Sequence, residues 1–320
     1  MMKKNNAKRV IMNLAPLAGL LLLLIVFLIL GTVADYNISY GMKAVINQSI
    51  VVAIVATGAI FIYTLGSFDI SLGASVAVSA LLGGMTYNAT ESIVCMLLVN
   101  IGIAVAVSLF NSVLASVFNL PVFVTTIAML SILNAVVLLL IRINDTGDKI
   151  AVPAEAVAAL DETWVKVLIL VVFLAFSLFV FEYTKIGRKQ KMVGSNPICA
   201  KLTGISDKKM AIIAFVMAGI GVGLGAFVST VYSPTLTRNT ASSVGMDVII
   251  AIVFGGMPVS GGARSKITAA VIGAFSMSFL GQIMTLLQLD SGIGQMVKAA
   301  IFIIVVFVAT LNQRGKMLPR

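Results

Sequence analysis

The chain has 320 residues, of which 60% are apolar and 11% are charged, and its mean hydropathy is +1.10. Soluble domains are about 45–50% apolar and about 25% charged, so the composition excludes a soluble protein and indicates an all-α polytopic membrane protein. The formal net charge is +10, and the presence of only two Cys (Cys95 and Cys199) and no His argues against a disulfide scaffold, a metal enzyme and a His-based proton pump.

About ten apolar segments follow one another along the chain, and a helix needs about 20 mostly apolar residues to cross a bilayer. The eighth segment is too short to cross alone and the third is rich in Gly and Ser, so both are candidates for broken or re-entrant helices. We expect one transmembrane domain over residues 14–311, between a basic amino-terminal segment 1–13 and a tail 312–320. The ten segments are Leu14–Gly31, Ala44–Leu65, Ile70–Tyr87, Ile93–Val117, Val122–Ile141, Trp164–Phe181, Met210–Thr230, Met246–Gly256, Ile267–Leu287 and Gly294–Leu311.

The basic residues indicate how these segments are oriented. With ten crossings and a cytoplasmic amino terminus, both termini lie in the cytoplasm, and 16 of the 22 Lys and Arg residues lie on that side. Most acidic residues then lie outside, as the positive-inside rule leads us to expect. The basic excess is therefore mainly an orientation signal rather than a sign of nucleic-acid binding. The basic residues assigned to the outside are Lys43, Arg142, Lys149, Lys166, Arg238 and Lys298.

Asp69 lies between the second and third segments and is the only acidic residue that the sequence clearly buries in apolar surroundings. A carboxylate at that depth normally faces a cavity or a partner. Asp is also a preferred N-cap residue, and Ser71 and Gly73 fit the turn that opens a helix. A capping role and a contact with a solute or a gate both stay open.

The longest cytoplasmic loop, residues 182–209, contains the signals of a short helix. Asn196 suits the N-cap and Pro197 the first helical position, while Gly204 suits the position just after the end, so we expect a helix from Pro197 to Thr203. Ile198 and Leu202 lie four residues apart and give it one apolar face. A helix this short needs a packing partner. It is either a connector folded back onto the membrane domain or a docking helix for a cytoplasmic partner.

Two groups of glycines mark positions of special backbone geometry. Four glycines in the seventh segment form two interleaved G-x-x-x-G pairs, which favours tight packing within the subunit over a seam between subunits. Four more glycines flank Pro258, so the chain must break its helix there, near a translocation path or an inner gate. The chain contains no G-x-x-x-x-G-K-[ST] motif, which argues against nucleotide binding by this loop. The glycines are Gly219, Gly221, Gly223 and Gly225 in the first group, and Gly255, Gly256, Gly261 and Gly262 in the second.

Four stretches carry the most specific pattern: Gly66–Gly73, Leu120–Thr126, the loop pieces Thr184–Arg188 with Gly194–Ile205, and Phe254–Gly262. They resemble, in the same order, motifs of the ribose-type ABC sugar permeases, within the branched-chain and monosaccharide permease superfamily. The loop pieces are similar to the T-x-F-G-R and G-G-N-P-x-A-A-x-x-S-G-I of that family. The departures from the family pattern are modest and fall at Ser67, Ile186, Ser195 and Pro258.

The resemblance implies a permease subunit of an ATP-driven importer in a prokaryotic cell membrane, and not an enzyme. Two permease subunits would pair, and a cytoplasmic ATPase carrying ATP and Mg²⁺ would dock on each loop. An extracytoplasmic binding protein would deliver a sugar or related neutral polyhydroxy solute, and this chain would hold no cofactor or metal. The coupling residues would be Gly187, Arg188, Gly194, Asn196, Pro197, Ile198, Leu202 and Gly204. The candidates for the translocation path or gate are Asp69, Ser71, Gly73, Phe123, Thr125, Gly255, Gly256, Ser260 and Gly261.

Two other classes of function fit the residues less well. An ion- or proton-coupled secondary transporter needs ionisable residues within the membrane, and the sequence offers no His and one clearly buried acid. An intramembrane enzyme needs a nucleophile with an activating partner, which no segment supplies. Within the family a nucleoside could replace the sugar, so the solute stays open, as does the choice between a homodimer and two related permeases.

Overall fold

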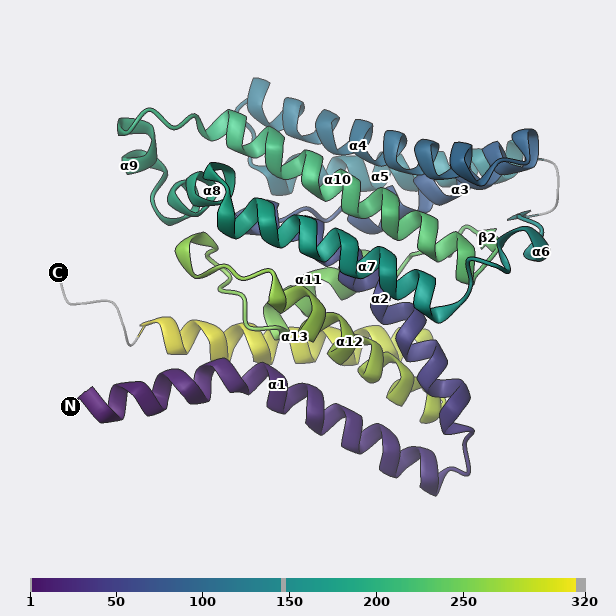
Figure 1. Ribbon diagram of the computed structural model, residues 1–320, viewed down its shortest axis with the longest axis horizontal. Helices are drawn as coiled ribbons and strands as arrows, with labels where there is room; N and C mark the ends of the chain where they lie inside the picture. Colours follow the sequence, from purple (N-terminus) through teal and green to yellow (C-terminus); the bar gives the residue numbers. More distant parts are fainter. Residues whose placement is uncertain (1, 145–147, 315–320) are drawn as a thin grey trace.

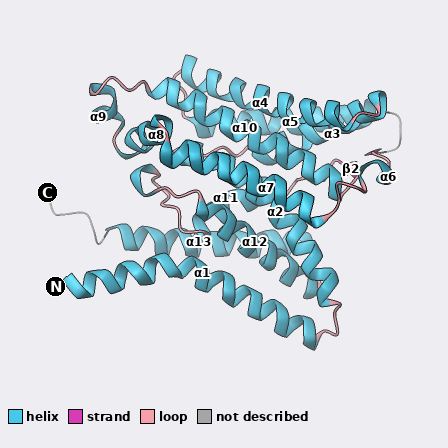
Figure 2. Ribbon diagram, viewed as in Figure 1, coloured by secondary structure: helices cyan, strands magenta, loops and turns pink. Residues whose placement is uncertain are grey.

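The computed structural model describes residues 2–144 and 148–314, which are helical along most of their length (Figure 1, Figure 2). Two short strands, β1 (Lys149–Ala151) and β2 (Thr235–Thr237), pair in antiparallel register with Ile150 opposite Leu236. The helices of the first half are α1 (Met2–Val33), α2 (Ile38–Thr64), α3 (Leu72–Thr90), α4 (Ile93–Val117), α5 (Val122–Ile143), α6 (Ala154–Val157) and α7 (Thr163–Leu178). Those of the second half are α8 (Lys185–Ser195), α9 (Pro197–Leu202), α10 (Asp207–Tyr232), α11 (Val244–Phe254), α12 (Thr268–Leu286) and α13 (Ser291–Arg314).

Seven of the described helices are long and apolar enough to cross a membrane: α1, α2, α4, α5, α7 with its π-helical extension Phe179–Tyr183, α10 and α12. Two more, α11 and the Gly292–Phe307 part of α13, are apolar but shorter. All ten predicted segments coincide with helices, and most boundaries agree within a few residues. The largest difference is at the start, because α1 begins at Met2 rather than at Leu14.

Helix α2 forms the centre of the bundle, and every residue from Ser49 to Thr64 is buried. It crosses α10 where Gly58 faces Gly221: a Cβ added to Gly221 would lie 3.1 Å from the Cα of Gly58. On the other side of α10, a Cβ on Gly219 would lie 2.7 Å from the Cα of Val105 in α4. The glycines of the seventh segment therefore serve tight packing within the subunit, as the sequence predicts.

The two segments predicted to be broken, α3 and α11, both begin inside the molecule. Residues 65–71 and 238–243 lead into them without forming a regular helix, and the two helix starts meet. A Cβ on Gly73 would lie 2.7 Å from the backbone nitrogen of Gly245. Both helices open on the same pattern, Ser-x-Gly, at Ser71 and at Ser243. The positive ends of two helix dipoles thus lie close together in the interior.

The two ends of the bundle carry different elements (Figure 1). The strand pair β1–β2 and α6 lie at one end, which we name the β end. Helices α8 and α9, the first turns of α1 and the last turns of α13 lie at the other, which we name the α9 end. Residues 182–209 thus contain two helices, α8 and α9, whereas the sequence predicts only the second.

Candidate functional site

Helix α9 begins at Pro197 with Asn196 as its N-cap, as the sequence predicts, and ends at Leu202, one residue before the predicted end. The side chain of Asn196 accepts a hydrogen bond from the backbone N–H of Cys199 at 3.0 Å, and Gly204 has a φ of +79° just after the helix. The buried Ala200 packs against Val193 of α8 and Met210 of α10. One side of this two-turn helix is therefore fixed to the membrane domain.

The opposite side of α9 is uncovered. Ile198 is 74% exposed and Leu202 is 83% exposed, and the two side chains lie one turn apart. The two side chains lie at one end of the bundle rather than on its apolar sides (Figure 1), so contact with lipid tails does not explain their exposure. Two adjacent large apolar side chains on a polar surface are typical of a protein interface.

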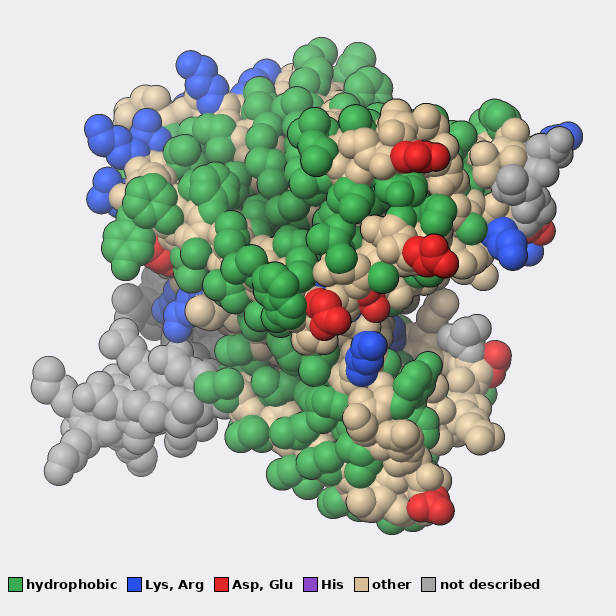
Figure 3. Space-filling model, turned by 45° about the vertical axis from the view of Figure 1, so that its right-hand side comes forward, with side chains coloured by type: hydrophobic (Ala, Val, Ile, Leu, Met, Phe, Trp, Pro, Cys, Tyr) green, Lys and Arg blue, Asp and Glu red, His purple; other side chains and the backbone are tan. Residues whose placement is uncertain are grey.

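Helix α8 supports α9 and carries positive charge. Its Gly187 leaves no room for a side chain, because a Cβ there would collide with the carbonyl of Phe181. Arg188 on the same helix is exposed. Figure 3 shows Lys and Arg side chains gathered over the α9 end, whereas most Asp and Glu side chains on the visible face lie toward the β end. An acidic partner surface would complement this distribution.

Three chain segments meet backbone to backbone beneath α8: residues 63–66 at the end of α2, residues 194–195 at the end of α8, and residues 260–263 of the glycine-rich loop. We name this contact the glycine junction. A Cβ on Gly194 would collide with the carbonyl oxygen of Thr64, and one on Gly261 would lie 2.6 Å from the same oxygen. Gly261 and Gly262 also have φ values of +66° and +83°, where a larger residue would be strained.

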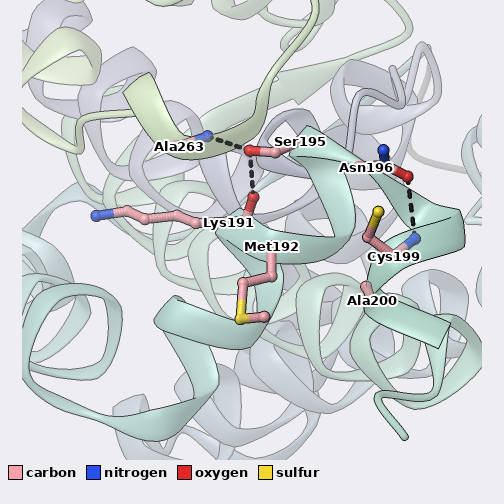
Figure 4. A pocket seen from close by; sticks show the side chains of 7 residues that line it. All are labelled: Lys191, Met192, Ser195, Asn196, Cys199, Ala200 and Ala263. Carbon is pink, nitrogen blue, oxygen red and sulfur yellow. Dashed lines mark hydrogen bonds between the residues drawn. The ribbon is translucent and has the colours of Figure 1, made fainter. Parts of the chain in front are cut away.

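Ser195 is the side chain that joins two of these segments (Figure 4). Its hydroxyl donates to the carbonyl of Lys191 at 2.7 Å and accepts from the backbone N–H of Ala263 at 2.9 Å. A shallow groove opens beside this contact and leads to α9. It is lined by Lys191, Met192, Ser195, Asn196, Cys199, Ala200 and Ala263.

The candidates for the translocation path or gate separate into two places. Gly255, Gly256, Ser260 and Gly261 lie at the α9 end, where Gly255 lets α11 approach Ala269 of α12. The others lie deeper or on α5, so the structure does not bring the predicted set together. Phe123 is 51% exposed at the start of α5, and Thr125 and Asp69, Ser71 and Gly73 are buried.

Asp69 belongs to a chain of buried polar groups. Its Oδ1 accepts hydrogen bonds from the backbone N–H and the hydroxyl of Ser71 at 2.8 and 2.7 Å. The Ser71 hydroxyl in turn accepts from the amide of Asn111 in α4 at 3.0 Å. Asp69 thus holds the turn before α3, but the N-cap residue of that helix is Ser71, which makes no side-chain capping bond, so Asp69 is not the cap that the sequence suggested.

A second acid, Asp247 of α11, is equally buried, so Asp69 is not the only one as the sequence suggested. Its Oδ1 lies 2.6 Å from the Nζ of Lys298 in α13, and its Oδ2 has no hydrogen-bond partner among the described residues. The sequence assigned Lys298 to the outer side of the membrane, which this contact does not test, and Asp247 and Lys298 each fall inside a predicted segment. The presence of one acidic and one basic residue in two apolar segments was the sequence signal that could have predicted this ion pair.

Lys166 of α7, which the sequence also assigns to the outer side of the membrane, is fully buried within the subunit. Its Nζ donates to Asp161 and to the side chain of Asn47 in α2, each at 2.7 Å. The buried Lys166 and the partly buried Lys298 are thus each neutralised by a carboxylate, as burial of a charge requires. Among the described residues, no group of three or more Cys, Asp or Glu side chains is placed to hold a metal ion.

Breaking the Asp247–Lys298 pair on one side should destabilise the fold. Asp247→Asn or Lys298→Met alone leaves an uncompensated buried charge or acceptor, and we expect each to lower the free energy of unfolding by about 3–5 kcal/mol. The double variant should recover most of that loss, as measured by thermal unfolding in detergent.

The exposed pair Glu182–Lys191, at 2.8 Å, is the matched control, and removing either partner should cost about 1 kcal/mol or less. A double variant at Asp247 and Lys298 that is no more stable than the worse single variant would contradict the pairing.

Comparisons with known proteins agree with this geometry. The model of the family described as "Branched-chain amino acid transport system / permease component" matches residues 41–306. The autoinducer 2 import system permease protein LsrC of Photorhabdus laumondii is 25% identical over 289 residues, covering 88% of this chain and 85% of the relative. The ribose import permease protein RbsC of Escherichia coli K12 is 23% identical over 309 residues, covering 92% and 94%.

A third relative, the probable ABC transporter permease protein YphD of Escherichia coli K12, is 28% identical over 214 residues, covering 64% of this chain and 62% of the relative. No solved structure matches the chain. The family match covers most of the chain, including the core of the bundle, the glycine junction and α9. The chain is thus a multi-pass membrane protein that belongs to the permease components of the branched-chain amino acid transport family, as the resemblance to ribose-type permeases predicted.

Proposed function

We propose that the chain is the permease subunit of an ATP-driven importer for a sugar or related neutral polyhydroxy solute. The observation that carries the proposal is the uncovered apolar face of α9, Ile198 and Leu202, on a helix that is fixed to the membrane domain by its other face. A permease without ATPase chemistry of its own needs such a surface to receive force. The relatives support the class of solute, since one imports ribose and another autoinducer 2 according to their names.

The topology that goes with this function has ten crossings, with both termini in the cytoplasm. The seven long apolar helices supply seven, and we assign the other three to α3, α11 and α13. Helices α3 and α11 cross together with the irregular segments 65–71 and 238–243 that precede them, which is tolerated where the backbone is buried in protein. The basic α9 end would then be cytoplasmic.

The partners follow from the two ends. A cytoplasmic ATPase that holds ATP and Mg²⁺ would dock on α9 and the groove beside Ser195, with Arg188 near the contact. A binding protein would deliver the solute at the β end. A second permease subunit would complete the translocation path.

The glycine junction provides a route for force. A push on α9 reaches α8 through Ala200 and Val193, and α8 touches the glycine-rich loop through Ser195. The loop touches the segment that leads to Asp69, because a Cβ on Gly66 would lie 3.3 Å from the carbonyl oxygen of Ser260. The start of α3 is thus connected to the docking face by an apolar contact, the Ser195 hydrogen bond and the backbone contacts of the glycine junction, and such close packing transmits displacement.

The charges in the interior fit a neutral solute better than an ion. Lys166 and Lys298 are paired with carboxylates, and Asp69 accepts hydrogen bonds from Ser71. Among the deeply buried described residues, Asp69 is the one carboxyl group without a cation partner, and it holds the turn before α3. Hydroxyl and amide groups suit sugars, and they suit nucleosides equally, so both solutes stay within the proposal.

An acidic side chain on the apolar face of α9 should abolish docking. In the Ile198→Asp and Leu202→Asp double variant a desolvated carboxylate would oppose the contact, and we expect at least a tenfold loss of ATPase recovered with the permease. The variant should keep the thermal unfolding temperature of the parent, because both side chains are exposed.

The matched control is the Ile198→Met and Leu202→Met variant, which keeps the face apolar and should recover the ATPase in full. Full recovery of the ATPase with the Asp variant would show that α9 is a connector and not a docking helix.

Uptake should depend on ATP and not on a proton gradient. In proteoliposomes that contain the permease, its ATPase and its binding protein, we expect ATP on the ATPase side to drive uptake of ribose or autoinducer 2, with no effect of a protonophore. Asp69→Asn should leave this independence unchanged, because its amide oxygen can still accept from Ser71. Uptake driven by an imposed pH gradient without ATP, and lost in Asp69→Asn, would instead indicate a secondary transporter.

A further inference from the structure

Helix α5 carries a polar side chain where a lipid-facing helix should have none. Asn134 is the thirteenth of 22 residues in the span Val122–Ile143, so it lies near the middle of the bilayer. The side chain is exposed, and its amide has no hydrogen bond to any described residue of the subunit. Lipid tails offer no donor or acceptor, so an amide at this depth normally bonds to another helix or faces water.

Comparable side chains elsewhere in the subunit are satisfied or covered. Asn111 and Gln282 are buried and hydrogen-bonded within the subunit, and Asn47 binds Lys166. Ser108 and Ser276 are buried as well. Asn134 is therefore the one amide that is exposed near the middle of a long described span, whereas Gln48 is half-buried near Gly281 and Gln295 lies near the start of α13.

Small residues share the exposed side of α5 with Asn134, next to the larger Ile127 and Leu138, which are 41% and 56% exposed. Ala128, Ser131 and Ala135 are exposed and lie on the side of α5 opposite the buried Met129 and Leu133. Small residues at spacings of three and four let two helices approach closely in a membrane. The exposed face of α7 carries no amide and presents mainly large apolar side chains such as Leu168, Val172 and Phe176 near its middle, which suit lipid.

We infer that this face of α5, residues 128, 131, 134 and 135, is the surface on which a second copy of this chain pairs with the first. An amide is both a donor and an acceptor, so two Asn134 side chains related by a two-fold axis can bond to each other. Small residues on both sides of the axis let the helices approach closely enough for that bond. The inference rests on the proposed function, which requires two permease subunits, and adds where they meet.

Helix α4 offers the strongest competing surface. Gly102 and Ala106 are exposed there and lie four residues apart, and a Cβ on Gly102 would meet nothing within 4 Å. That face has no hydrogen-bonding side chain that needs a partner, so lipid can cover it. The unsatisfied amide of Asn134 favours α5.

Disulfide cross-linking tests the location of the seam. In full-length protein with Cys95→Ala and Cys199→Ser, we expect Asn134→Cys to form a covalent dimer with copper phenanthroline in native membranes, and Ala135→Cys to do the same. Val172→Cys on α7 is the depth-matched control and should stay monomeric. Asn134 lies nine residues before Ile143, and Val172 lies nine residues after Thr163, the two helix termini nearest the β end. Gly102→Cys tests the α4 face and should also stay monomeric.

Three further readings make the result decisive. Equal membrane levels and unfolding temperatures show that each variant is folded, and Ala135→Cys gives the same readout by a smaller change than Asn134→Cys. A folded Asn134→Cys and Ala135→Cys that both remain monomeric overturn the inference, as does a dimer formed through Gly102→Cys instead. Recovery of the ATPase with the same membranes separates the two claims, because a retained ATPase without cross-linking refutes only the seam.

In a separate measurement Asn134→Leu, which keeps the size of the side chain but removes the amide, should shift the parent protein toward monomers at least severalfold in lipid bilayers. Asn134→Gln, which keeps a donor and an acceptor, should stay closer to the parent. An unchanged dimer fraction in Asn134→Leu would overturn the role of the amide.

Discussion

Contact between helix backbones at glycine is the constraint on which the rest of the structure depends. In a membrane, helices gain little from burying apolar surface against each other, so close packing and hydrogen bonding must hold them together. Gly58 and Gly221 let α2 and α10 cross at the centre, and Gly73 and Gly245 let the two half-length helices begin beside each other. The same kind of contact recurs at the glycine junction, where three segments touch without intervening side chains apart from Ser195.

This constraint connects the parts of the proposed transporter. Because the glycine junction lies between α8 and the end of α2, the surface proposed for docking is built on a helix that is buried throughout from Ser49 to Thr64. The interior polar groups at Asp69 and Ser71 lie on the segment that leaves this junction. A docked ATPase would therefore act on backbone that runs directly to the start of α3, and the glycine-rich loop becomes part of that linkage rather than a separate gate.

The sequence predicted best what local signals determine. The caps at Asn196 and Gly204 define α9, and the short, glycine-rich segments correctly indicated α3 and α11 as interrupted helices. The sequence did not predict helix α8, because Gly187 and Gly194 lower its helix propensity and its stability comes from packing against other segments. The sequence also did not predict the Asp247–Lys298 pair or the glycine junction, because each joins residues that are far apart in the chain.

The most direct test of the account is the number of solute molecules transported per ATP hydrolysed in proteoliposomes carrying Ser195→Ala. This change removes the hydrogen bond to Ala263 and leaves the apolar face of α9 intact. The matched control is Thr86→Val, whose hydroxyl bonds only to its own helix near the β end. The account predicts that Ser195→Ala keeps the ATPase bound but transports severalfold less solute per ATP, while Thr86→Val matches the parent. An unchanged ratio in Ser195→Ala, with the ATPase still bound, would contradict transmission through the junction.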